Sequence, residues 1–270
     1  MPLIPNPSLR LALLGVGLTV TAASWAGGQD LAVSLDTTVV LDGSVIADHV
    51  VVGEVLGSLV PLPIGALPAS VDVAAFHAVG SDYYLSLDTT AALPGGVTAE
   101  PRDVVRSRDG RFTVFFDGSA VGLPRGVAID ALVIDENNGD TIFSLDVDAA
   151  LPDLFAADED LVRFDGGRFE LVLDSSAEGA SPALDLDAAA RDGDDWIVSF
   201  DTSGVVDGVP FDDGDALIVV RGQGWGPAVD EDDLAPGDLD ALDLANLLPG
   251  ALFFDGFESG NFGAWSQASP

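Results

Sequence analysis

Four aspartates occupy equivalent places along the chain and are its best candidates for chemistry. Each follows a large aliphatic residue, precedes valine or alanine, and opens a short apolar segment: Asp72, Asp130, Asp187 and Asp240. Carboxylate oxygens are ligands that Ca²⁺ prefers, and the ion takes about six to eight oxygens. The sequence therefore predicts that these four carboxylates are metal ligands, forming a ring if the elements that carry them meet at a central channel.

A local role competes with metal binding for other aspartates. An aspartate followed by threonine, serine or glycine accepts backbone N–H bonds in an Asx turn and ends a strand. That pattern occurs at Asp36, Asp117, Asp174 and Asp201. Residues 135–140 (Asp-Glu-Asn-Asn-Gly-Asp) look a little like a calcium loop. They lack the spacing and the closing glutamate of an EF-hand, so a tight turn is the better interpretation.

Catalytic signals are sparse. The chain has no cysteine and two histidines, His49 and His77, and neither histidine has a nucleophile at a recognisable spacing. Nucleophile elbows, zinc-protease motifs and phosphate-binding loops are absent from the sequence. A glycosidase needs only two neighbouring carboxylates, so this chemistry stays open as the alternative. The short supply of tryptophan and tyrosine for stacking sugars argues against it.

The elements that position these aspartates form a repeat. An apolar phrase ending in aspartate occurs about every 55 residues, as Val33–Asp36, Leu85–Asp88, Phe143–Asp146 and Val198–Asp201. A second phrase begins with Asp48, Asp103, Asp160 or Asp215, a third is clear only in the two middle units, and a fourth carries the candidate ligands. Each phrase is short, rich in Val, Ile, Leu and Phe, and bounded by turn residues, as strands are.

Each unit is therefore predicted to be a four-stranded antiparallel sheet, which cannot bury both faces alone. Four-stranded repeats of this length are the blades of β-propellers, so we expect an all-β fold with four blades within residues 31–250. Leu31–Asp36 and Leu239–Leu244 would close the ring. A stack of sandwich domains, which needs a longer repeat, and an open β-solenoid are the rivals. Ala251–Asp255 resembles a further first strand, which would be surplus in a closed ring.

Antiparallel order places the aspartates of a blade at one end. The fourth and second strands begin at their aspartates, whereas the first and third strands end at theirs. The longer loops, such as 91–102 and 118–127, lie at the same end, and the short turns lie at the other. One face of the ring should therefore be strongly acidic.

The N-terminus and the charge indicate an exported chain. Residues 1–26 contain Arg10, an apolar run and a small-x-small end, which together are typical of a secretory signal peptide. The mature chain is then expected to be secreted, periplasmic or on the cell surface, with no membrane span. The chain has 45 acidic residues against 10 arginines and no lysine, a net charge of −35. Such a field repels nucleic acid and anionic lipid.

The C-terminal tail, residues 251–270, carries a resemblance. The segment 255–261 (Asp-Gly-Phe-Glu-Ser-Gly-Asn), followed by Trp265, resembles a C-terminal segment found on many secreted bacterial proteins of otherwise unrelated sequence. The repeats are likewise similar to those of aspartate-rich secreted bacterial proteins. These resemblances imply an exported bacterial protein and no particular activity.

The sequence thus predicts a non-catalytic binding or structural protein, with bound Ca²⁺ as a possible stabilising ion. An extracellular protein or a glycan is the expected partner. The alternative is an extracellular, glycosidase-like hydrolase that uses a carboxylate pair at the channel mouth.

Overall fold

The computed structural model describes residues 30–35, 38–41, 44–47, 49–55, 58–229 and 239–245. The expected signal peptide and C-terminal tail lie outside these residues, as do Asp36, Asp48 and the Ala251–Asp255 phrase. No helix in the described part of the chain is long and apolar enough to cross a lipid bilayer.

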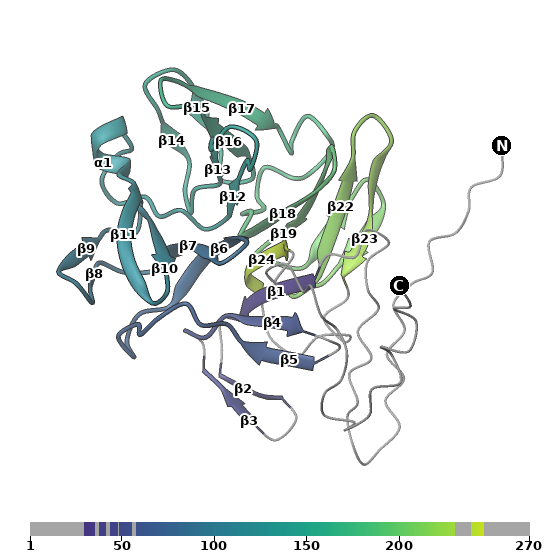
Figure 1. The fold of residues 1–270 in the computed structure, drawn as a ribbon. Helices are drawn as coiled ribbons and strands as arrows, with labels where there is room; N and C mark the ends of the chain where they lie inside the picture. Colours follow the sequence, from purple (N-terminus) through teal and green to yellow (C-terminus); the bar gives the residue numbers. More distant parts are fainter. Residues whose placement is uncertain are drawn as a thin grey trace, which may run out of the picture.

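Four antiparallel four-stranded sheets form a four-bladed β-propeller, as the repeat predicts (Figure 1). From the inner to the outer strand, blade 1 contains β24 (Leu239–Ala245), β1 (Asp30–Leu35), β4 (Val52–Val55) and β5 (Ser58–Pro61). Blade 2 contains β6 (Val73–Val79), β7 (Asp82–Leu87), β10 (Val104–Arg108) and β11 (Arg111–Phe116). Blade 3 contains β12 (Leu132–Ile134), β13 (Thr141–Phe143), β16 (Leu161–Phe164) and β17 (Phe169–Leu173). Blade 4 contains β18 (Ala188–Asp192), β19 (Asp195–Ser199), β22 (Ala216–Val220) and β23 (Gly224–Val229).

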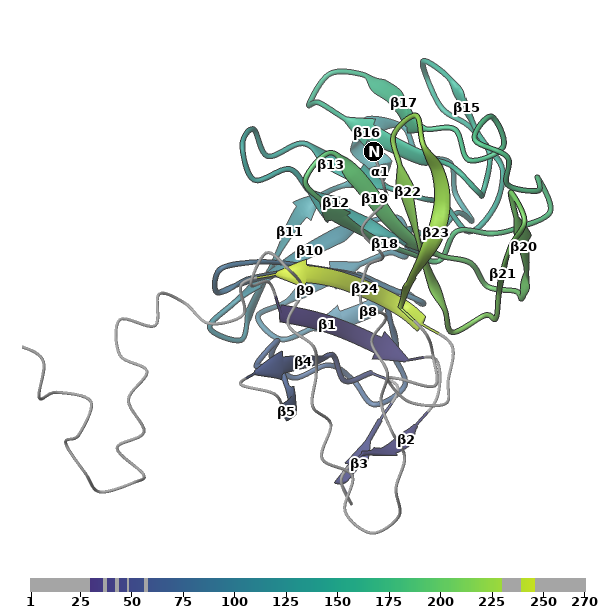
Figure 2. The ribbon, with the colours of Figure 1, turned by 90° about the vertical axis from the view of Figure 1, so that its right-hand side faces the viewer.

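The two distant ends of the described chain close the ring. β24 pairs antiparallel with β1, with Leu31 opposite Leu244 and Val33 opposite Leu242. The two strands lie side by side in Figure 2, β1 in purple and β24 in yellow. This pairing is the closure that the sequence predicts. Each inner strand also contacts the inner strands of both neighbouring blades, so the four blades surround one axis.

The core is divided among the four interfaces between blades. One apolar cluster fills each interface, represented by Phe76, Phe143, Phe200 and Ile197. These four side chains are at most 1% exposed. Because each blade needs a neighbour on both sides to cover its apolar faces, the ring is the smallest unit that buries them all.

Each blade carries a two-stranded hairpin that the sequence reasoning treated as loop. These hairpins connect the second strand of a blade to the third: β2 (Val39–Leu41) with β3 (Ser44–Ile46), β8 (Ala91–Leu93) with β9 (Val97–Ala99), β14 (Ala149–Ala150) with β15 (Phe155–Ala156), and β20 (Gly204–Val206) with β21 (Val209–Phe211). The one helix among the described residues, α1 (Gly118–Val121), follows β11. The outermost strand, which the third sequence phrase forms and which is clear from the sequence in two units, is present in all four blades.

Candidate functional site

Aspartates gather at one end of the ring, as predicted. We call this end, where inner strands begin and the hairpins emerge, the acidic end. The short turns that join neighbouring strands lie at the opposite end, which we call the turn end. Of the predicted positions, those within the described residues are Asp72, Asp88, Asp103, Asp117, Asp130, Asp146, Asp160, Asp174, Asp187, Asp201, Asp215 and Asp240.

Several of these aspartates fasten one strand to the next. Asp88 Oδ1 accepts a hydrogen bond from the backbone N–H of Asp72 at 2.7 Å, and Asp146 Oδ1 accepts one from Ala128 at 2.6 Å. Each bond links the segment before an inner strand to a residue that follows the second strand of the same blade. These carboxylates therefore join two strands of one blade, through bonds that are not those of Asx turns.

A second group bridges the outer strands. Asp103 accepts hydrogen bonds from the backbone N–H groups of Glu100 at 2.9 Å and Gly118 at 3.0 Å. Asp160 repeats this arrangement in blade 3, and both aspartates are less than 9% exposed. Asp117 caps helix α1 by accepting a bond from Ala120 at 2.9 Å. The expected Asx role of Asp117 is thereby confirmed.

The four predicted ring ligands differ in burial and in their hydrogen bonds. Asp130 is hydrogen-bonded by the Ser144 hydroxyl, and burial, followed by the charge of Asp185, raises its pKa well above the ordinary value. Asp72 Oδ1 accepts the N–H of Val73 at 2.8 Å. Asp187 and Asp240 are half-buried. Since these contacts do not join the four carboxylates to one another, the four-residue metal ring stays a prediction.

A different carboxylate group comes together beside hairpin β14–β15. Oxygen atoms of Asp148, Asp158 and Glu159 all lie within 4.8 Å of one another. The backbone N–H of Asp158 donates to Asp148 Oδ1 at 3.2 Å, which holds the two sides of the hairpin base together. Glu159 is only 2% exposed, and burial raises its pKa.

Asp185 extends this group from the neighbouring blade. The backbone N–H of Leu186 donates to the carbonyl oxygen of Asp158 at 3.2 Å, which brings the loop before β18 against the loop before β16. Asp185 Oδ1 is buried and has no hydrogen-bond partner. Burial, and then the charges of Asp158 and Asp201, raises the pKa of Asp185 to about 7. We call Asp148, Asp158, Glu159 and Asp185 the acidic cluster.

Sequence reasoning missed this acidic cluster. Its members lie in the segments 146–148 (Asp-Val-Asp), 158–160 (Asp-Glu-Asp) and 185–187 (Asp-Leu-Asp), beside the repeated aspartates but not at the repeated positions themselves. A search for equivalent positions therefore favoured the other four aspartates, and only the folded chain shows that these loops meet.

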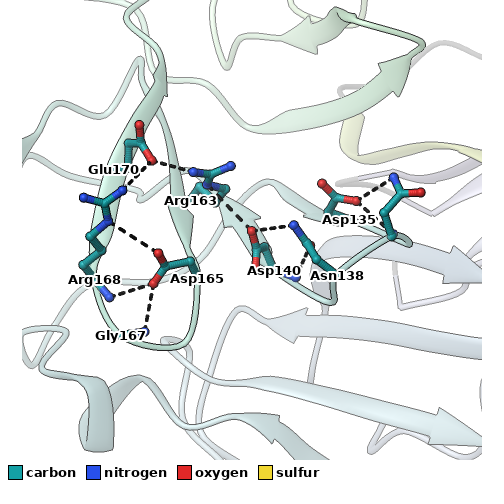
Figure 3. Close-up of polar contacts among 9 residues, drawn as sticks. Asp135, Asn138, Asp140, Arg163, Asp165, Gly167, Arg168 and Glu170 are labelled. Carbon is teal, nitrogen blue, oxygen red and sulfur yellow. Dashed lines mark hydrogen bonds and ion pairs between the residues drawn. The ribbon is translucent and has the colours of Figure 1, made fainter.

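Most of the arginines lie away from the acidic end. Among the described residues, seven of nine belong to strands or turns near the turn end: Arg106, Arg108, Arg111, Arg163, Arg168, Arg191 and Arg221. Figure 3 shows part of this arrangement in blade 3, where Arg163 lies 2.5 Å from Glu170 and Arg168 lies 3.4 Å from Asp165. The acidic end therefore receives little neutralisation from within the described chain.

The segment 135–140 uses its polar side chains within a turn, also visible in Figure 3. Asp135 Oδ1 accepts the backbone N–H of Asn137 at 2.9 Å, and the backbone N–H of Gly139 donates to the carbonyl of Asp135 at 2.7 Å. The tight-turn interpretation is confirmed.

A cavity of about 450 Å³ opens between blades 2 and 3. Its lining includes Asp88, Glu100, Arg102, Arg125 and Asp146. Neither Asp130 nor Asp185 lines this cavity or the second cavity, which lies between blades 3 and 4 at Arg163, Trp196 and Arg221. The two carboxyls with the most strongly raised pKa values are thus outside both cavities.

His77, the histidine in blade 2, is a packed strand residue, as expected for a lone histidine. It is 6% exposed and lies against Asp243 of β24. That contact places it in the ring closure rather than in the acidic cluster.

Comparison with known proteins gives only distant structural likeness. No family model and no curated protein matches the chain. The structure is similar to that of YCF48 bound to D1 peptide, with 9% identity and a TM-score of 0.30, over 72% of this chain and 68% of that one.

It is also similar to extracellular domains of a putative one-component and a putative hybrid two-component system from B. thetaiotaomicron. These have 10% identity, with TM-scores of 0.32 and 0.33 over 80% and 76% of this chain. The chain spans 29% of the length of each of these domains. The assignment of the four-bladed fold therefore rests on the sheet order and the closed ring.

Proposed function

We propose that this chain is a non-catalytic extracellular binding module whose acidic end binds Ca²⁺. The observation that supports this function is the acidic cluster: three carboxylates have oxygens within 4.8 Å of one another, and beside them Asp185 has a buried oxygen without a hydrogen-bond partner. The extracellular location is inferred from the signal-like residues 1–26.

Carboxylates held this close repel one another, and burial strengthens the repulsion. The raised pKa of Asp185 reflects first its burial and then the repulsion from Asp158 and Asp201. A divalent cation would remove this repulsion by supplying positive charge where Arg102 and Arg125 are the only described arginines at the acidic end. Ca²⁺ suits the cluster because it accepts a flexible arrangement of carboxylate, carbonyl and water oxygens.

Thermal unfolding after EDTA treatment tests the proposal. Added Ca²⁺ is expected to raise the melting temperature, by roughly 5–10 °C at about 100 times the dissociation constant. Asp158→Asn should weaken this response because it removes a ligand charge. Asp192→Asn removes the same charge from an exposed position at the turn end and should leave the response intact. A melting temperature unchanged by millimolar Ca²⁺, or an equal loss of response in both variants, would contradict the proposal.

One observation favours the alternative, a glycosidase-like hydrolase. Asp130 and Asp185 both have raised pKa values, and after burial the charge of Asp185 contributes to the shift of Asp130. A protonated carboxylic acid beside a second carboxylate is the arrangement that glycoside hydrolysis requires. Turnover of aryl glycosides or polysaccharides by the wild type, lost in Asp185→Asn and kept in Asp192→Asn, would establish this function in place of the first.

A further inference from the structure

The hairpins at the acidic end expose apolar side chains. Val45 on β3 is 70% exposed, Phe155 on β15 is 62% exposed and Val205 on β20 is 61% exposed. These are the three most exposed large apolar residues in the described part of the chain. They lie on the hairpins of three different blades, and two of these hairpins, β2–β3 and β20–β21, project from the ring in Figure 2.

Strand alternation shows that these positions have no structural need to be apolar. In each hairpin the adjacent residue points inward and is buried: Ile46 at 7%, Ala156 at 1% and Val206 at 0% exposed. That inward residue fixes the hairpin to the blade. The outward residue has no structural need to be apolar, so a valine or phenylalanine there is available for contact with another molecule.

Cross-strand partners widen the apolar surface. Phe155 pairs with exposed Ala150, and Val205 pairs with exposed Pro210. We call the outward residues Val45, Ala150, Phe155, Val205 and Pro210 the hairpin surface.

The charge around the hairpin surface identifies the partner. The acidic cluster flanks hairpin β14–β15, with Asp148 directly before β14 and Asp158 two residues after the end of β15. A partner that contacts the exposed Phe155 therefore comes close to several carboxylates, which attract cations and repel phosphate groups. We infer that the hairpin surface binds a basic polypeptide segment that alternates cationic and apolar side chains. This inference rests on the proposed role of the acidic end as the binding end, but not on Ca²⁺.

Binding of synthetic peptides tests the inference. The probe alternates lysine with leucine and phenylalanine, and its control alternates lysine with serine at the same length and charge. Calorimetry of the full chain at physiological salt should show tighter binding of the apolar probe. A triple variant, Val45→Ser with Phe155→Ser and Val205→Ser, should bind it at least tenfold more weakly.

A matched triple variant separates the hairpin surface from general stickiness. Val114→Ser, Phe115→Ser and Leu171→Ser remove the same number of exposed apolar side chains from the outer strands β11 and β17. This variant should bind the probe as the wild type does. Phe155→Ser alone, which changes only an exposed side chain, gives a second measure if the hairpin triple folds poorly, and it should also weaken binding.

Equal affinity for both peptides, or equal loss in both triple variants, would overturn the inference. The Ca²⁺ dependence of the melting temperature, measured on the wild type and on the hairpin triple variant, distinguishes failure of the peptide-binding inference from failure of the calcium proposal. If the variant loses the probe and keeps the Ca²⁺ response, both proposals stand. If the wild type shows no Ca²⁺ response but binds the probe through the hairpins, the calcium proposal alone fails.

Discussion

His77 Nδ1 lies 2.8 Å from Asp243 Oδ1, an ion pair between the inner strand of blade 2 and the closing strand of blade 1. Asp243 is fully buried, and its second oxygen accepts the backbone N–H of Ala78 at 2.8 Å. His77 and Asp243 thus connect the inner strands of blades 1 and 2, at the place where the ring closes.

This ion pair should make stability depend on pH. Burial lowers the pKa of His77, but the charge and hydrogen bond of Asp243, followed by the charge of Glu136, outweigh it and raise the pKa above 6.5. Across the strand pair, His77 also faces the Tyr84 phenol. Because the folded pKa is raised, the stabilisation is complete below pH 6.5 and is lost as the pH rises through the folded value.

Urea unfolding from about pH 5 to pH 9 measures this loss, which we expect His77→Gln to abolish. His49→Gln is the matched control, since His49 lies outside the closing pair. An NMR titration that places the pKa of His77 below that of a free imidazole would contradict the prediction.

Asp185 predicts a second pH effect, with a different cause. Its folded pKa is raised from 3.8 to about 7, so its contribution to stability is full below pH 3.8 and falls as the pH rises through 7. In EDTA at pH 8, Asp185→Asn should therefore stabilise the chain, by about 1–2 kcal/mol once solvent screening is allowed for. With Ca²⁺ present the sign should reverse, because the variant loses a ligand. Denaturant unfolding of Asp185→Asn and the wild type, in EDTA and in Ca²⁺, measures both effects. A lower free energy of unfolding for the variant in EDTA would contradict the prediction that the Asp185 charge destabilises the metal-free chain.

The strand positions could be predicted because burial restricts them. The two strands nearest the axis of a blade are covered on both faces by neighbouring blades, so the second strand β7 (Asp82–Leu87) is buried along its whole length and its sequence phrase stands out. The outer strand β11 is exposed at four of its six positions, so fewer of its residues must be apolar. This explains why the third phrase, which forms the outer strand, is harder to recognise in the sequence. The ring closure could be predicted because a copy of the first phrase lies near one end of the chain and a copy of the fourth phrase lies near the other.

The hairpins were missed because their strands have only two or three residues with one buried side. A usable signal was present at Asp207-Gly208, whose φ angles of 47° and 84° are those of a type I′ turn. The acidic cluster had no comparable signal. Asp158 and Asp185 meet only because two loops from different blades are hydrogen-bonded through Leu186.

The bridging aspartates should matter more for stability than the capping ones. Asp103 is 8% exposed and serves two backbone N–H groups, one of them the buried group of Gly118. Asp103→Ala leaves these donors unsatisfied and should cost about 2–3 kcal/mol. Exposed Asp117 caps a single turn, so Asp117→Ala should cost about 1 kcal/mol. Urea unfolding of both variants tests the order, and a larger loss for Asp117→Ala would contradict the bridging role.

The apolar cores between blades should tolerate cavities poorly. Phe143 is fully buried between blades 2 and 3, with its ring 5.6 Å from that of Phe116 and 6.3 Å from that of Phe169. Phe143→Ala should cost about 3–5 kcal/mol because the surrounding rings cannot collapse into the cavity. Phe155→Ala, on the exposed hairpin, should change stability by less than about 0.5 kcal/mol.

The shape of the transition carries further information. Each blade contributes to two interfaces, so a cavity at one interface should lower the unfolding midpoint of the whole ring and leave a single transition with an unchanged m-value. If Phe143→Ala instead produced two separate transitions, blades 2 and 3 would be shown to unfold independently. The ring closure through β1 and β24 would then not be what makes the four blades cooperative.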